Sequence, residues 1–139
     1  MRGNVDKLHL ARAISPVSVA DTTAQTSEYV DVKGYNKCTF AIAIGSVADA
    51  DATFAVTMTE CDTSGGSYTA VAAADISGTL TLAGFQFDDD NEVRKVGYKG
   101  SKRYVKLVIT PSANASAALM SAVAVLEEPA LAPTANPPV

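Results

Sequence analysis

Residues 38–44 read CTFAIAI, and larger apolar side chains alternate with smaller or polar ones along the whole stretch. Side chains of an extended chain point alternately to opposite faces, so this pattern predicts a β-strand with one buried face. Residues 53–61 (TFAVTMTEC) and 104–110 (YVKLVIT) repeat the alternation. In the last segment, the side chains that we expect to face inward are Val105, Leu107 and Ile109.

Weaker strand patterns lie at residues 28–32, 77–82, 85–87, 93–98 and 118–126. The last of these, ALMSAVAVL, also suits a helix because Ala, Leu and Met favour one, but valine and alanine alternate in its second half, which favours a strand. Turns that contain glycine, asparagine or proline separate the segments. Short strands at this spacing predict an all-β, single-domain antiparallel β-sandwich or jelly-roll-like barrel.

The two ends differ from the predicted sandwich, which we place at residues 21–127. Residues 1–20 form an extended N-terminal arm with one candidate strand, ISPVSV at 14–19. Residues 128–139 contain four prolines, which cannot occupy a central strand or a helix interior. Such a proline-rich C-terminal tail is normally disordered, and a neighbouring subunit or larger assembly is the simplest partner that would order it.

The two cysteines are too few for a disulfide scaffold and lack metal-ligand spacing. If residues 38–44 and 53–61 pair as a hairpin, matching their apolar faces places Cys38 and Cys61 on opposite faces of the sheet. We therefore expect two reduced thiols.

The residue inventory gives little support to catalytic chemistry. The chain has one histidine, His9, and no motif that sets a base beside a serine or cysteine nucleophile. The acidic run DDDNE at 88–92 lacks the alternate spacing and glycine of a calcium loop. We expect a solvated turn there, with a weak or interfacial calcium site as the alternative. The sequence thus predicts no enzyme, no catalytic residue, no resident metal and no cofactor.

Membrane and nucleic-acid roles also have little support. Charged residues interrupt the first twenty positions, so no apolar core of a secretory signal can be drawn, and no apolar run approaches the roughly 20 residues that cross a bilayer. We expect a soluble protein in which the acceptor sequence Asn-Ala-Ser at Asn114 is accidental. A net charge of −4 argues against direct contact with nucleic acid.

Charge is distributed unevenly along the chain. Residues 49–92 contain nine acidic side chains and no basic one, whereas residues 94–106 contain six basic side chains and no acidic one. The pattern predicts one negative and one positive flank, and a partner-binding surface on the basic segment that meets an acidic partner or an identical subunit. Its residues are Arg94, Lys95, Lys99, Lys102, Arg103 and Lys106. The alternative is that strand-edge lysines only block unwanted edge pairing.

The segment VGYKGSKRYVKLVIT at 96–110, followed by SAVAVLEEPALAP at 121–133, resembles small structural proteins of tailed bacteriophages and prophages. These proteins carry Gly-Tyr-x-Gly-x-Lys-Arg-Tyr-x-Lys-Leu before a last strand and a proline-containing tail. The matching residues are Gly97, Tyr98, Gly100, Lys102, Arg103, Tyr104, Lys106 and Leu107. An arm with ISPVSV and the strand segments occur in the same order, so the resemblance covers most of the chain.

The resemblance implies a capsid decoration or cement protein, which is made in the bacterial cytoplasm and then located on the outside of the virion. Such proteins are small β-rich domains, often trimers, that bridge neighbouring major capsid subunits. An arm and a tail that reach neighbouring subunits add contact area, and repetition over a shell adds avidity. The alternatives are a tail, head-closure or fibre-associated virion protein, or a carbohydrate-binding β-sandwich.

Overall fold

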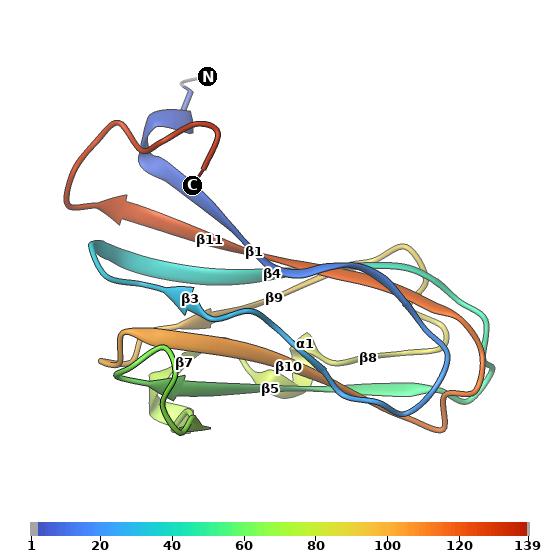
Figure 1. Cartoon of the computed structure of the whole chain (residues 1–139). Helices are drawn as coiled ribbons and strands as arrows, with labels where there is room; N and C mark the ends of the chain where they lie inside the picture. Colours follow the sequence, from blue (N-terminus) through green and yellow to red (C-terminus); the bar gives the residue numbers. More distant parts are fainter. Residues whose placement is uncertain (1–2, 139) are drawn as a thin grey trace.

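The computed structural model describes residues 3–138, which form two antiparallel sheets packed face to face (Figure 1). The first sheet has the strand order β1 (Leu8–Val19), β11 (Ala118–Pro129), β4 (Tyr35–Val47), β9 (Val93–Tyr98) and β7 (Ile76–Ser77). The second sheet has the order β2 (Gln25–Thr26), β10 (Tyr104–Ser112), β5 (Thr53–Cys61) and β6 (Thr69–Ala70), with β3 (Val30–Asp31) beside β10 and β8 (Phe85–Gln86) beside β5. The predicted β-sandwich is confirmed, and of the two predicted architectures the barrel is not formed.

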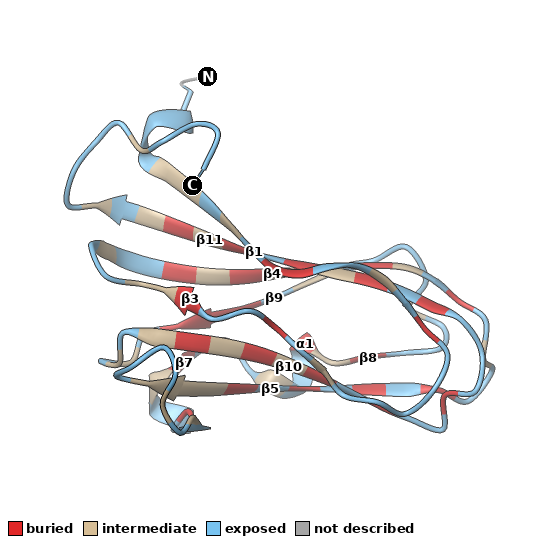
Figure 2. Cartoon of the chain, in the orientation of Figure 1, coloured by how far each residue is buried: buried red, intermediate tan, exposed pale blue. Residues whose placement is uncertain are grey.

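The core lies between the sheets, where alternate residues of each long strand are buried (Figure 2). The inward-facing side chains expected from the period-two pattern are buried, namely Cys38, Phe40, Ile42, Ile44, Phe54, Val56, Met58, Val105, Leu107 and Ile109. Strand β11 buries mainly alanines, and Ala124 lies directly opposite Phe40 of β4. A small side chain beside a large one lets the layer pack without a void. Residues 118–126 thus form a strand and not a helix, as the alternation of valine and alanine predicts.

The hairpin considered for residues 38–61 is not formed, and one expected strand is wrong. Strands β4 and β5 do not form a hairpin, because the chain between residues 48 and 52 crosses from the first sheet to the second. Residues 77–82 are not a strand. They contain the end of β7, a turn at Gly78 with φ of +83°, and the start of helix α1 (Leu80–Ala83), which the Thr79 side chain caps by accepting a hydrogen bond from Leu82 N at 3.2 Å.

The N-terminal arm and the C-terminal tail contact each other within one chain. Most of the arm is strand β1, which pairs with β11 along the edge of the first sheet and includes the predicted strand at 14–19. The 3-10 helix η1 (Val5–Lys7) precedes β1, and Thr134 N of the tail donates to Asp6 O at 2.9 Å. Both described ends therefore lie at the same end of the sandwich, above the arrowhead of β11 in Figure 1.

Candidate docking surface

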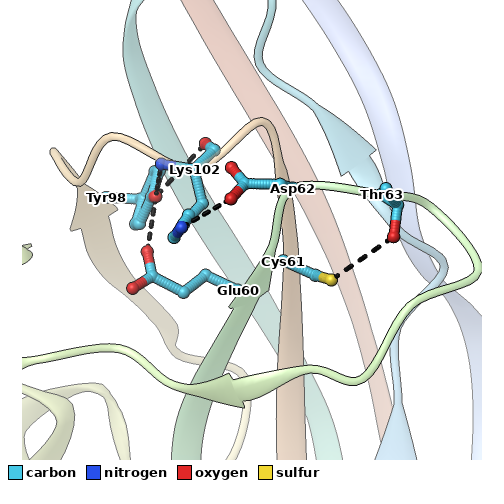
Figure 3. Close-up of polar contacts among 6 residues, drawn as sticks. All are labelled: Glu60, Cys61, Asp62, Thr63, Tyr98 and Lys102. Carbon is cyan, nitrogen blue, oxygen red and sulfur yellow. Dashed lines mark hydrogen bonds and ion pairs between the residues drawn. The ribbon is translucent and has the colours of Figure 1, made fainter.

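The basic segment carries the chain from β9 of the first sheet to β10 of the second, and a polar network stabilises this crossing (Figure 3). The hydroxyl of Tyr98, at the end of β9, donates to Glu60 Oε2 on β5 at 2.6 Å and accepts a hydrogen bond from Lys102 N at 2.9 Å. Burial and the bond to the Glu60 carboxylate raise the pKa of Tyr98. The protonated hydroxyl thus links the two sheets where the chain passes from β9 to β10.

Two glycines of the motif at residues 97–107, Gly97 and Gly100, are explained by close packing in this crossing. A Cβ atom on Gly100 would lie 2.6 Å from the Tyr98 ring, and a Cβ atom on Gly97 would lie 3.0 Å from the Ser77 side chain. Side chains at these positions would displace the ring or the neighbouring strand β7. Leu107 is buried in the core. Much of the motif therefore maintains the fold.

The cations of the basic segment are partly neutralised by acidic residues of the same chain. Arg94 Nη2 lies 2.7 Å from Asp89 Oδ1 and 2.7 Å from Glu92 Oε2. Lys102 Nζ lies 2.5 Å from Asp62 Oδ2, and the Asp62 carboxylate raises the pKa of this lysine.

The guanidinium of Arg103 makes two hydrogen bonds to Asp31, at 3.0 and 2.7 Å, and these bonds lower the pKa of Asp31. Three of the six cations are thus paired within the chain. The expected separation into a negative and a positive flank is wrong at these positions. The partners of Lys102 and Arg103 are distant in sequence but close in space, whereas Arg94 pairs with the acidic turn directly before it.

The three remaining cations form no ion pair within the described residues, and they do not share a surface. Lys95 is exposed on the outer side of β9, Lys99 is exposed in the turn after β9, and Lys106 lies on the outer side of β10, 4.3 Å above the Tyr68 ring. The six predicted docking residues are consequently spread over both sheets and the turn between them.

The outer side of the first sheet carries several exposed apolar side chains between charged and polar ones, a feature that the prediction from sequence missed. We call this surface the outer apolar face. Successive rows across the sheet place Leu10 beside Val125, and Val123 beside Ala41. The larger exposed side chains, with their exposed fractions, are Val93 (69 %), Leu10 (49 %), Leu119 (45 %) and Val123 (38 %). A groove of about 410 Å³, lined in part by Val17, Ala43, Gly45 and Leu119, crosses its end.

The acidic run at 88–92 is bound into the structure of its own turn. The Asp89 carboxylate accepts from Gln86 N and contacts Arg94, and Asp90 Oδ1 accepts from Val47 N at 3.0 Å. Within residues 3–138, no group of three or more His, Cys, Asp or Glu side chains is arranged to hold a metal ion. The turn therefore uses its carboxylates as backbone caps.

The other residues singled out from sequence have structural roles. His9 stacks on Tyr35, with ring centroids 5.5 Å apart. The Asn114 side chain is buried and donates hydrogen bonds to Val19 O and Asp21 O, so it is not exposed for glycosylation. Both cysteines are free, and burial raises the pKa of Cys38 to about 12. None of the described helices could span a membrane.

No protein-family description matches the chain, and no curated protein matches it. Among the solved structures that align with the chain are two at low identity. The CBM22-1–GH10 modules of Clostridium thermocellum endo-1,4-β-D-xylanase 10B, complexed with xylohexaose, align at 11 % identity with a TM-score of 0.47 over 95 % of this chain and 28 % of that chain. Dimeric latent PorU from Porphyromonas gingivalis aligns at 12 % identity with a TM-score of 0.43, over 88 % of this chain and 12 % of that chain. The chain thus spans less than a third of each.

Proposed function

We propose that the chain is a non-enzymatic structural protein of a tailed-phage virion, which binds the outer surface of the assembled capsid and bridges major capsid subunits. The observation that carries this proposal is the outer apolar face. Large apolar side chains that gather on one exposed face of a sheet often mark an interaction site. The resemblance of residues 96–110 to phage structural proteins supplies the kind of partner.

Charge favours a partner other than a second copy of the same face. The row of paired residues through Val123 and Ala41 continues to a cation on each side. These cations are Arg12 on β1 and Lys95 on β9. Neither cation forms an ion pair within the described residues. An acidic capsid surface would neutralise both cations, whereas a second copy of this face would offer the carboxylate of Glu127, which lies one row beyond Val125 and beside Lys37. Trimer formation would then use other surfaces.

The test is cosedimentation with empty expanded capsids, built from the major capsid protein of the genome that encodes this chain. We expect saturable binding by the unaltered protein and at least a tenfold weaker affinity for Val123→Asp, since a carboxylate would enter the apolar centre of the interface. Thr57→Asp, at an exposed central position of the second sheet, is the matched control. Mass photometry of the free protein reports its oligomeric state.

Equal binding by the Val123→Asp and Thr57→Asp variants, with both folded, would exclude the outer apolar face as the docking surface. Absence of binding by the unaltered protein would exclude the capsid role itself. Binding confined to one vertex would instead favour a head-closure or tail protein.

A further inference from the structure

Tyrosines gather on the outer side of the second sheet, opposite the outer apolar face. The rings of Tyr29 and Tyr104 meet edge to face with centroids 5.3 Å apart. Two residues after Tyr104 on the same strand β10, Lys106 Nζ lies 4.3 Å from the centroid of the Tyr68 ring. We call these four residues the tyrosine patch.

The register of the second sheet brings the patch together from three separate segments. Tyr104 lies opposite Asp31 of β3 and opposite Cys61 of β5. Tyr29 precedes Asp31 by two residues, so both side chains point to the same outer side. Tyr68 approaches from the loop before β6, where its hydroxyl donates to Ser64 O at 3.1 Å. Aromatic side chains distant in sequence therefore lie beside one another.

The patch has one cation that is not neutralised by the chain. The Arg103 guanidinium packs over Tyr104 at 4.9 Å, but two hydrogen bonds commit it to Asp31. Lys106 makes no ion pair within residues 3–138 and contacts only an aromatic face among the described charged and aromatic pairs. The Lys106 ammonium, which lies among tyrosines, can therefore bind one carboxylate of a ligand.

Small hydroxylated side chains continue the surface along β5 and β10. Thr59 lies directly opposite Lys106, and Thr57 lies opposite Val108 one step further along the strands. Tyr29 is 48 % exposed, so part of its ring is open to solvent. These groups suit an acidic sugar. Aromatic rings can stack on the apolar side of a sugar ring, hydroxyl groups can form hydrogen bonds with its hydroxyls, and one cation can pair with its carboxylate.

We propose that the tyrosine patch binds a glycan that carries a carboxylate on one of its sugars. Lys106 pairs with the carboxylate, and Tyr29 and Tyr68 contact the sugar rings. A nucleic acid would fit less well, because it presents one phosphate per nucleotide to a chain of net charge −4 with one unpaired cation in the patch. The site lies on the opposite sheet from the capsid-docking face and does not depend on the proposed function.

The experiment is an NMR titration of the isotope-labelled protein with 3′-sialyllactose and a hyaluronan hexasaccharide. Lactose and maltohexaose are the neutral counterparts, and an oligothymidylate is the nucleic-acid comparison. We expect shift changes confined to the tyrosine patch, saturation with a carboxylated sugar, and at least tenfold weaker binding of both neutral sugars. Lys106→Gln and Tyr29→Ala should each weaken binding at least fivefold. Lys99→Gln removes an exposed cation outside the patch and should leave the affinity unchanged.

Three results would overturn the proposal. These are no binding of either carboxylated sugar, equal affinity of the Lys106→Gln and Lys99→Gln variants, and binding of an oligothymidylate without binding of any acidic sugar. Because the titration uses free protein and no capsid, its failure is distinct from failure of the cosedimentation experiment.

Discussion

The two outer sides of the sandwich have different chemistry although the same period-two pattern builds both sheets. The outer apolar face presents Leu10, Val93 and Val123 to solvent, whereas the equivalent positions on β5 carry Thr57 and Thr59. Burial explains the inward side chains of both sheets but leaves the outward ones free to vary. We therefore infer function from the outward-facing side chains. The apolar ones on the first sheet suit a permanent partner, and the hydroxylated and aromatic ones on the second sheet suit a soluble ligand.

The largest expected effect is a difference in stability between substitutions at two adjacent residues of β10, one that faces the core and one that faces outward. Leu107→Asp places a carboxylate in the core, where Leu107 is fully buried, and should cost about 4 kcal/mol or more and unfold the domain. Lys106→Gln, one residue earlier and facing outward, loses only its contact with Tyr68 and should cost no more than about 1 kcal/mol. Circular dichroism during urea unfolding measures both. A folded Leu107→Asp variant would contradict the assignment of faces.

The next effect concerns the link between the two sheets. Tyr98→Phe removes the hydroxyl that bonds Glu60 and Lys102 N, so two polar groups near the core lose their partner. We expect a loss of about 1–3 kcal/mol in unfolding free energy. The control is Tyr104→Phe, because the Tyr104 hydroxyl makes no hydrogen bond within the described residues. Equal stability of the two variants would show that the network in Figure 3 contributes nothing.

The inside of the sandwich could be predicted from the sequence because alternation is a local property. The buried residues of β4, β5 and β10 follow from their own segments, and the alternation of Val123 with Ala124 was enough to prefer a strand over a helix. Strand partners could not be predicted, because nothing between residues 48 and 52 distinguishes a tight turn from a crossing between sheets. The short helix α1 was missed because the cap at Thr79 resembles an ordinary polar strand position.

The candidate site was harder to predict, because ion pairs depend on which residues are close in space, and the order of charges along the chain does not show this. Arg94 and Lys102 are neutralised by carboxylates of the acidic stretch 49–92, and Arg103 is neutralised by Asp31. Substitution of Lys102 and Arg103 by acidic residues would therefore place carboxylates beside Asp62 and Asp31. The tyrosine patch required the register of β3, β5 and β10, which no single segment contains.

The smallest expected effect tests whether these pairings shape the second sheet in solution. Hydrogen bonds from Arg103 lower the pKa of Asp31, so the ionised carboxylate stabilises the folded state. That contribution is fully present above the unfolded-state pKa of about 3.9 and is lost as the pH falls through the lowered folded-state value. Arg103→Gln should therefore show a smaller fall in Tm between pH 6 and pH 3 than the unaltered protein. The difference will be small because both side chains are partly exposed and water screens the pair.

Lys99→Gln removes the same charge from the turn without breaking an ion pair, so its fall in Tm over this pH range should match that of the unaltered protein. If Arg103→Gln and Lys99→Gln behave alike, Asp31 is not held by Arg103 in solution. In that case Arg103 is a second free cation beside Tyr104, and the tyrosine patch would suit a ligand with two negative charges rather than one. The pH series thus decides the charge that the patch presents, which is the property that most distinguishes it from the outer apolar face.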